Sequence, residues 1–182
     1  MQPDLWHDLS PGNDLPNVVT TIIEIPRRSR NKYEYSKKDG VIKLDRMLYS
    51  SIYYPGDYGF IPQTYFDDDD PLDILVMLSN ETFPGCLVEA RPIGMLKMID
   101  KEERDYKILA VATGDPNYSD FHSLADVPQH YLVEVRHFFR TYKQLEGGVV
   151  EDLGWADVED ARAEILRSVQ LYEKTFTKQP KK

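Results

Sequence analysis

The sequence Asp67-Asp68-Asp69-Asp70-Pro71-Leu72-Asp73 places five carboxylates within seven residues, directly before the apolar run Ile74-Leu75-Val76-Met77-Leu78. The apolar run is short, uninterrupted and partly β-branched, so it predicts a buried strand. Carboxylates crowded at the end of such a strand repel one another and raise each other's pKa. The cluster therefore calls for a counter-charge, and oxygen-bound divalent cations are one candidate. The alternative is a solvated acidic loop, which is what most charge runs are. The stretch alone leaves these two interpretations equally open.

The composition predicts one globular domain over residues 1–182, with an extended N-terminal segment (1–16) and a frayed tail (178–182). The chain is 41% hydrophobic and 29% charged, with no apolar run long enough to span a bilayer and no signal peptide. Its single cysteine, Cys86, excludes an intramolecular disulfide and is typical of a reducing compartment. We therefore expect a cytoplasmic protein without a membrane partner.

The net charge of −9 argues against a general nucleic-acid binder, which would need a basic surface. It does not exclude an anionic substrate, because bound cations invert the local field of an acidic site.

The order of the predicted elements indicates an α+β fold that is rich in strands. Apolar or alternating runs bounded by turn residues predict strands over 17–25, 32–35, 41–44, 74–78, 86–99 and 106–112. Lys37-Lys38-Asp39-Gly40 predicts the hairpin turn between two of them. Asp126, as N-cap, and Asp157 each open a helix with an apolar stripe, and a short link joins the two helices. Short strands with frequent bends favour a small barrel.

Acidic, basic and phenolic side chains gather at the predicted strand ends. The acidic ones are Glu24, Asp68, Asp70, Asp73, Asp100 and Asp105, and the basic and phenolic ones are Lys32, Arg46, Tyr58, Lys107, Tyr142 and Lys143. This combination suits phosphoryl transfer, because metals bind one edge of a phosphate and cationic donors bind the other. The acidic stretch is not an EF-hand, since Asp73 and Ser79 occupy positions that need glycine and glutamate.

Eight segments, taken in order, resemble the prokaryotic type of family I soluble inorganic pyrophosphatases. They are Ile23-Glu24-Ile25-Pro26, Lys32-Tyr33-Glu34, Asp45-Arg46, Tyr54-Pro55-Gly56-Asp57-Tyr58-Gly59, the signature Asp68-Asp69-Asp70-Pro71-Leu72-Asp73-Ile74, Lys97-Met98-Ile99-Asp100, Asp105-Tyr106-Lys107, and His137-Phe138-Phe139 with Tyr142-Lys143. The resemblance implies a five-stranded oligonucleotide/oligosaccharide-binding-type barrel with additional strands and two C-terminal helices. It also implies Mg²⁺-dependent hydrolysis of pyrophosphate to two phosphates, which drives biosynthetic reactions forward and supports phosphate metabolism.

The resemblance also assigns a role to each site residue. Asp68, Asp73 and Asp105 would hold one metal, Asp73 would bridge to a second, Asp100 and Asp105 would hold a metal that arrives with substrate, and Glu24 would assist through water. Asp70 would take the proton of the water that bridges two metals, and the resulting hydroxide would attack in line. The expected substrate-binding residues are Lys32, Glu34, Arg46, Tyr54, Tyr58, Lys107, Tyr142 and Lys143. Several Mg²⁺ ions per subunit are expected, with Mn²⁺ or Zn²⁺ as substitutes, and a homohexamer is expected by analogy.

Three residues depart from the family pattern, and two other functions compete with it. Asp57 stands where many relatives have Asn, Asp69 fills a slot often held by Gly or Ser, and Lys101 replaces an acid found in some relatives. These departures put metal affinity and pH optimum in question, and leave the reaction itself intact. The first rival is an oligonucleotide-binding barrel that stacks bases on its aromatic residues, against which the charge of −9 argues. The second is a two-metal nuclease or phosphodiesterase, which the residues alone do not exclude.

Overall fold

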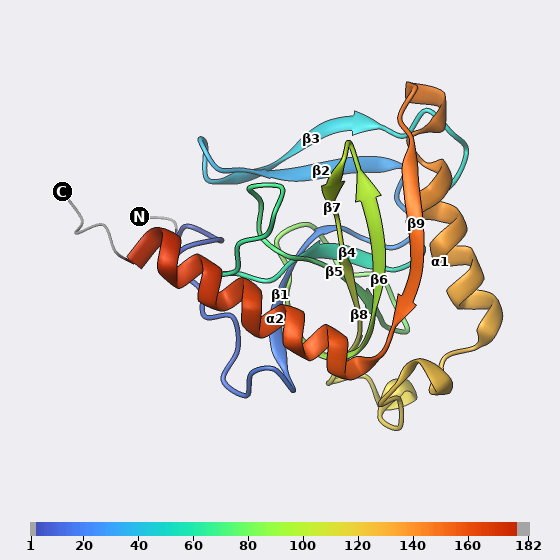
Figure 1. The fold of residues 1–182 in the computed structure, drawn as a ribbon. Helices are drawn as coiled ribbons and strands as arrows, with labels where there is room; N and C mark the ends of the chain where they lie inside the picture. Colours follow the sequence, from blue (N-terminus) through green and yellow to red (C-terminus); the bar gives the residue numbers. More distant parts are fainter. Residues whose placement is uncertain (1–2, 178–182) are drawn as a thin grey trace.

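The computed structural model describes residues 3–177 and shows a β-barrel flanked by helices (Figure 1). Within these residues, five strands hydrogen-bond in a closed ring, in which only β5 and β8 pair in parallel. Around the ring the strands are β1 (Val19–Ile25), β4 (Asp57–Phe60), β5 (Asp73–Met77), β8 (Lys107–Ala112) and β6 (Leu87–Asp100), which pairs back to β1. The predicted fold class, a β-rich α+β protein with a five-stranded barrel, is confirmed.

Further strands extend the barrel. The long strand β6 continues past the ring and pairs with β7 (Glu103–Arg104) and β9 (Val150–Ala156). A separate hairpin is formed by β2 (Asn31–Ser36) and β3 (Val41–Met47). Its turn places Gly40 at a φ of 67°, as the predicted Asp-Gly turn requires.

Besides the two-residue β7, two strands lie where the sequence predicts none, and they are β4 and β9. In β4, Gly59 interrupts the aromatic pattern because a Cβ there would lie 1.8 Å from the Ile22 carbonyl oxygen of β1. In β9, where the sequence predicts only a link between helices, Gly154 breaks the alternation and coincides with a register shift against β6. Both strands form because a neighbouring strand supplies backbone partners, which the local sequence does not reveal.

The two long helices are α1 (Gln129–Thr141) and α2 (Val158–Tyr172), on different sides of the strands (Figure 1). Short helical turns are η1 (Pro116–Tyr118), η2 (Leu124–Asp126), η3 (Gln144–Glu146) and the π-helical η4 (Glu173–Thr177). Asp157 caps α2 as predicted, accepting bonds from the backbone N–H groups of Glu159 and Asp160. The prediction for Asp126 is wrong: this residue ends η2, and its carboxylate accepts the His122 and Ser123 N–H groups at 2.9 Å each. No helix in residues 3–177 combines the length and apolarity needed to cross a membrane.

Strand β5 is buried on both faces, which explains the uninterrupted apolar run. Ile74 and Val76 pack in a core that includes Ala161 and Ile165 of α2. Leu75 and Met77 point the other way, into a core that includes four buried residues of α1 (Leu132, Val135, Phe138 and Phe139). A strand held on both faces has little freedom to shift. The Asp73 carboxylate at its start is therefore fixed in position.

The N-terminal segment is folded back in a turn, where the sequence analysis expects an extended chain. Its turn covers residues 5–8 and buries Trp6 against Tyr172 and Phe176 near the end of α2. The indole Nε1–H donates to the Thr64 carbonyl at 2.9 Å. Burial of one large aromatic ring supplies the reason for the turn. The tail predicted to fray, residues 178–182, lies outside the described residues.

Candidate active site

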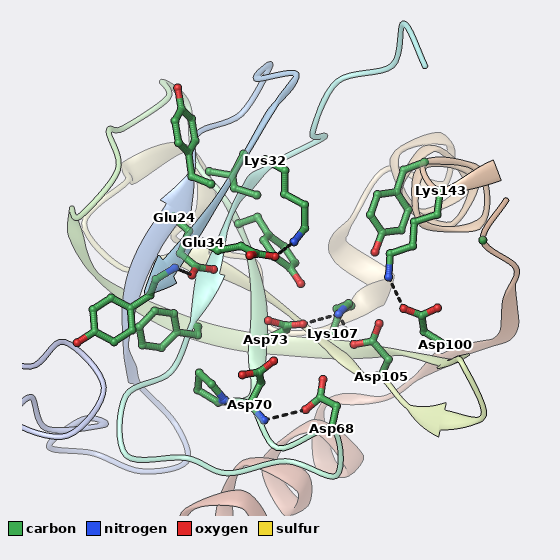
Figure 2. A pocket seen from close by; sticks show the side chains of 18 of the residues that line it. Glu24, Lys32, Glu34, Asp68, Asp70, Asp73, Asp100, Asp105, Lys107 and Lys143 are labelled. Atoms are coloured by element: carbon green, nitrogen blue, oxygen red, sulfur yellow. Dashed lines mark hydrogen bonds and ion pairs between the residues drawn. The ribbon is translucent and has the colours of Figure 1, made fainter. Parts of the chain in front are cut away.

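The predicted site residues converge on one cavity with a volume of about 710 Å³, and Tyr54 is the exception. Acidic side chains from the loop before β5, from the start of β5 and from the β6–β8 connection point into the same space (Figure 2). Lys32 and Glu34 face it from β2, and Lys143 faces it from the segment after α1. The cavity thus joins parts of the chain that lie more than a hundred residues apart in sequence, as Lys32 and Lys143 do.

At the centre of the cavity, the Lys107 ammonium is bonded to both Asp73 and Asp105. The parallel pairing of β5 with β8 sets Asp73 directly opposite Lys107, and Asp105 lies two residues before Lys107. Burial alone would lower the pKa of Lys107, but the two carboxylates raise it well above its ordinary value. The ammonium therefore stays charged, and it supplies the counter-charge that the acidic cluster needs.

The loop before β5 presents Asp68 and Asp70 to the cavity. The Asp70 N–H donates to the Asp68 carboxylate at 3.2 Å, and the intervening Asp69 has a φ of 64°. This left-handed conformation favours glycine, and aspartate tolerates it. Burial, followed by the charges of Asp73 and Asp105, raises the pKa of Asp68 to about 7. The negative charges of the neighbouring carboxylates therefore act on Asp68 as well.

Glu24 reaches the cavity from β1. Its carboxylate accepts the Tyr35 N–H of β2 at 2.6 Å. Burial raises the pKa of Glu24 to about 8, opposed by that hydrogen bond and reinforced by the charge of Asp73. A cation bound nearby would favour the charged form of both Glu24 and Asp68.

Three of the cationic groups that line the cavity, Lys32, Arg46 and Lys143, are each paired with a carboxylate. Lys32 contacts Glu34 and lies 3.6 Å from Asp45. Lys143 contacts Asp100. Arg46 contacts Asp45 and lies 2.8 Å from Glu146. An entering phosphate would therefore exchange these pairs for bonds to its own oxygens.

Two of the three predicted site tyrosines, Tyr58 and Tyr142, line the cavity, and the third, Tyr54, supports its wall. Tyr58 and Tyr142 are buried but reach the cavity, and burial raises the pKa of each hydroxyl, so both stay neutral hydrogen-bond donors. Tyr54 is 2% exposed and does not line the cavity. Its ring lies 5.5 Å from that of Tyr58 and 4.7 Å from that of Phe138. Tyr54 therefore packs behind Tyr58, and its contact with substrate stays a prediction.

Sequence reasoning missed Lys37, which lines the cavity from the β2–β3 hairpin. Its ammonium lies 2.5 Å from the Asp70 carboxylate and 2.8 Å from the Asp69 carbonyl oxygen, and 4.6 Å from the centre of the Trp6 ring. The hairpin turn that begins at Lys37 was visible in the sequence, but its distance to Asp70 was not. Asp57, by contrast, is buried away from the cavity, where it accepts bonds from the Arg27 N–H at 2.7 Å and from Thr82.

The donor set suits a hard divalent cation. Asp68, Asp73, Asp100 and Asp105 offer oxygen only, which is the ligand chemistry of Mg²⁺. Among residues 3–177, no three acidic, histidine or cysteine side chains meet closely enough to hold an ion as they stand. The Lys107 ammonium lies between two of the carboxylates instead. The residues fit such a cation in their chemistry, and binding would require Lys107 to turn away from Asp73 and Asp105.

Comparison with known proteins agrees with this arrangement. The family model for inorganic pyrophosphatase matches residues 21–173. An inorganic pyrophosphatase of Haloferax volcanii is 47% identical over 95% of this chain and 98% of its own length. One of a Nostoc species is 50% identical over 91% of this chain and 99% of its own. The crystal structure of inorganic pyrophosphatase from Thermus thermophilus is similar with a TM-score of 0.91 at 41% identity, covering 94% of this chain and 99% of that one. The chain therefore belongs to family I of the inorganic pyrophosphatases, close to its prokaryotic members, and the predicted enzyme class, inorganic diphosphatase, is confirmed.

Proposed function

We propose that the protein hydrolyses inorganic pyrophosphate to two phosphates in a Mg²⁺-dependent reaction, by in-line attack of water on phosphorus. The observation that carries the proposal is the single cavity that gathers Asp68, Asp70, Asp73 and Asp105 together with Lys32, Arg46 and Lys143. Carboxylates and cationic donors lining one cavity suit a substrate that binds together with divalent cations.

The carboxylates would divide the work of holding the cations. Asp68, Asp73 and Asp105 would hold one, Asp73 would also contact a second, and Asp100 with Asp105 would hold the cation that accompanies pyrophosphate. Glu24 would act through water from β1. Mg²⁺, or Mn²⁺ or Zn²⁺ in its place, would lower the pKa of water and offset phosphate charge.

Asp70 is the proposed proton acceptor. It lies on the same loop as Asp68, so its carboxylate borders the cluster and remains open to the cavity. A carboxylate there can take a proton from the attacking water. The Lys37 ammonium lies 2.5 Å from this carboxylate.

The cationic and phenolic groups would bind the two phosphates. Lys32, Arg46, Lys107 and Lys143 would donate charge-assisted hydrogen bonds to phosphate oxygens, and Tyr58 and Tyr142 neutral ones. Glu34 lines the cavity beside Lys32 and would hold that lysine in place. These donors would stabilise the negative charge that grows on the leaving phosphate.

The test is phosphate release from pyrophosphate, ATP and a dinucleotide, each measured with Mg²⁺ and with EDTA. We expect release from pyrophosphate that requires Mg²⁺ and far exceeds release from the other two. Absence of Mg²⁺-dependent release from pyrophosphate would overturn the proposal, and dinucleotide cleavage would favour a phosphodiesterase. The single-domain organisation, cytoplasmic location and homohexamer remain predictions, the last of which sedimentation of the purified protein can check.

A further inference from the structure

Asp67 does not line the cavity, yet its carboxylate is held by two arginines from different elements. Arg104 Nη2, on β7, lies 2.5 Å from Asp67 Oδ2. Arg167 Nη2, on α2, lies 3.1 Å from Asp67 Oδ1. Each carboxylate oxygen therefore has its own guanidinium, so neither arginine substitutes for the other. Arg167 is itself oriented by Glu164, which accepts its Nε–H at 2.5 Å.

Each arginine also faces an aromatic ring. The guanidinium of Arg167 lies 5.2 Å from the centre of the Phe66 ring, and that of Arg104 lies 5.9 Å from the centre of the Tyr106 ring. The two rings contact each other with their centres 5.6 Å apart. The unit of Asp67 and its two arginines, called here the Asp67 clamp, is thus packed against a pair of rings as well as ion-paired.

The clamp joins the two acidic segments of the cavity. Asp67 directly precedes Asp68, whereas Tyr106 lies between Asp105 and Lys107. The loop from Phe66 to Asp70 is neither helix nor strand, and its backbone is closed by a bond from the Phe66 N–H to the Asp70 carbonyl at 2.8 Å. Such a loop depends on side-chain contacts for its position against the barrel.

We infer that the Asp67 clamp positions the loop that carries Asp68 and Asp70 relative to Asp105, and that Arg104 and Arg167 are positioning residues for pyrophosphate hydrolysis. The inference rests on the roles proposed above for Asp68, Asp70 and Asp105. A small displacement of one acidic segment against the other would separate groups that must act on the same substrate.

The exposure of the clamp separates this role from a merely structural one. The side chains of Asp67, Arg104 and Arg167 are 24%, 46% and 36% exposed. Ion pairs this accessible to water contribute little to folding stability. Breaking the clamp should therefore reduce turnover far more than it lowers the melting temperature of the metal-free protein.

The experiment compares Asp67→Asn, Arg104→Gln, Arg167→Gln and the double variant Asp67→Asn/Arg104→Gln with the wild type. Arg162→Gln is the matched control, because it breaks an exposed pair with Glu159 on the same helix as Arg167. The measurements are kcat and KM for pyrophosphate at saturating Mg²⁺, and the melting temperature in EDTA. We expect each clamp variant to lose about tenfold in kcat. We also expect KM within about twofold of the wild type and the double variant to be no worse than its worse parent, because one coupled unit is broken.

Arg167→Lys keeps the charge but loses the planar guanidinium that contacts Glu164, Asp67 and the Phe66 ring together, so it should recover only part of the lost kcat. A kcat within about twofold of the wild type in all clamp variants, or losses that add independently, would overturn the inference. So would a fall in the metal-free melting temperature that parallels the loss of kcat and exceeds that of the control. If the wild type itself releases no phosphate from pyrophosphate, the proposed function fails; if it does and the clamp variants match it, the clamp inference alone fails.

Discussion

Asp73 and Lys32 face the same cavity from elements of different construction. Asp73 begins β5, whose residues pack in a core on each face of the sheet. Lys32 lies on β2, which hydrogen-bonds with β3 in a hairpin whose second strand is largely exposed. Residues with many buried contacts are held rigidly, and exposed hairpins open at lower cost. Asp73, which is proposed to hold cations, is therefore fixed by the core, whereas part of the phosphate-binding set lies on an element that can adjust.

The loop with Asp68 and Asp70 lies between these two extremes. It is covalently joined to β5 through Pro71 and Leu72, and Leu72 is fully buried. Its outer part is held by side chains from β7, α2 and the β2–β3 hairpin. We therefore expect substitutions in the three regions to differ in effect. Those on the barrel should abolish cation binding, those on the loop should reduce turnover, and those on the hairpin should weaken substrate binding.

The largest effect is expected for Asp73→Ala, on the rigid side. The substitution removes a carboxylate proposed to contact two cations and leaves the buried Lys107 with one partner fewer. We expect loss of the Mg²⁺-induced rise in melting temperature together with loss of activity of about a thousandfold or more. Glu81→Ala, at an exposed position outside the cavity, is the control. An unchanged Mg²⁺ shift in Asp73→Ala would refute its proposed role.

Asp70→Asn addresses the loop. The amide keeps the shape of the side chain but cannot accept a proton, so kcat should fall by about a hundredfold or more. Cation binding should survive, because Asp70 is not among the proposed ligands. Thermal unfolding with and without Mg²⁺, alongside kcat, separates the two effects. Near-normal turnover would show that another group takes the proton.

Arg46→Ala addresses the adjustable side. Its guanidinium is proposed to donate to phosphate, and a hydrogen bond to a charged group contributes about 1.5–3 kcal/mol. We therefore expect kcat/KM to fall by about ten- to a hundredfold, with an unaltered Mg²⁺ shift. Glu146→Gln is a matched control, because it breaks the pair between Glu146 and Arg46 but keeps the guanidinium. If Arg46→Ala instead abolished the Mg²⁺-induced rise in melting temperature, the proposal that the barrel binds cations and the hairpin binds phosphate would be wrong.

The smallest effect concerns Glu24 in the metal-free protein. Because burial raises the pKa of Glu24 to about 8 from its ordinary value of 4.5, folding favours the protonated form. The contribution of Glu24 to the free energy of unfolding is fully present below pH 4.5 and is lost as the pH rises towards 8. Glu24→Gln stays neutral and its side-chain oxygen can still accept the Tyr35 N–H, so it should gain stability relative to the wild type with rising pH.

Melting temperatures in EDTA across the range from acidic to alkaline pH check this prediction. We expect the difference between Glu24→Gln and the wild type to move in favour of the variant as the pH rises. Glu34→Gln is the control, because it makes the same substitution at a hairpin residue that is partly exposed and is paired with Lys32 in the wild type. A difference that stays constant with pH would show that Glu24 has an ordinary pKa in the folded protein.

Much of the site could be predicted from the sequence because its residues occur in short, ordered motifs. Three carboxylates of the acidic stretch before the predicted strand 74–78, Asp68, Asp70 and Asp73, line one cavity together with Glu24, Asp100 and Asp105. Tyr54 shows the limit: it belongs to the same motif as Tyr58, but its ring turns into the core towards Phe138. A motif fixes neighbours along the chain, whereas the direction of each side chain depends on what packs around it.

The sequence by itself determined the local features of this protein: the apolar run after the acidic stretch, the Asp-Gly turn, the Asp157 cap and the oxygen-only character of the cluster. These follow from residue type and spacing, which act over a few residues. Only the tertiary structure decided that β9 pairs with β6, that Lys107 lies between Asp73 and Asp105, and that Arg104 and Arg167 meet at Asp67. Those contacts join segments distant in sequence, and their energy exists only once the barrel and α2 have brought the segments together.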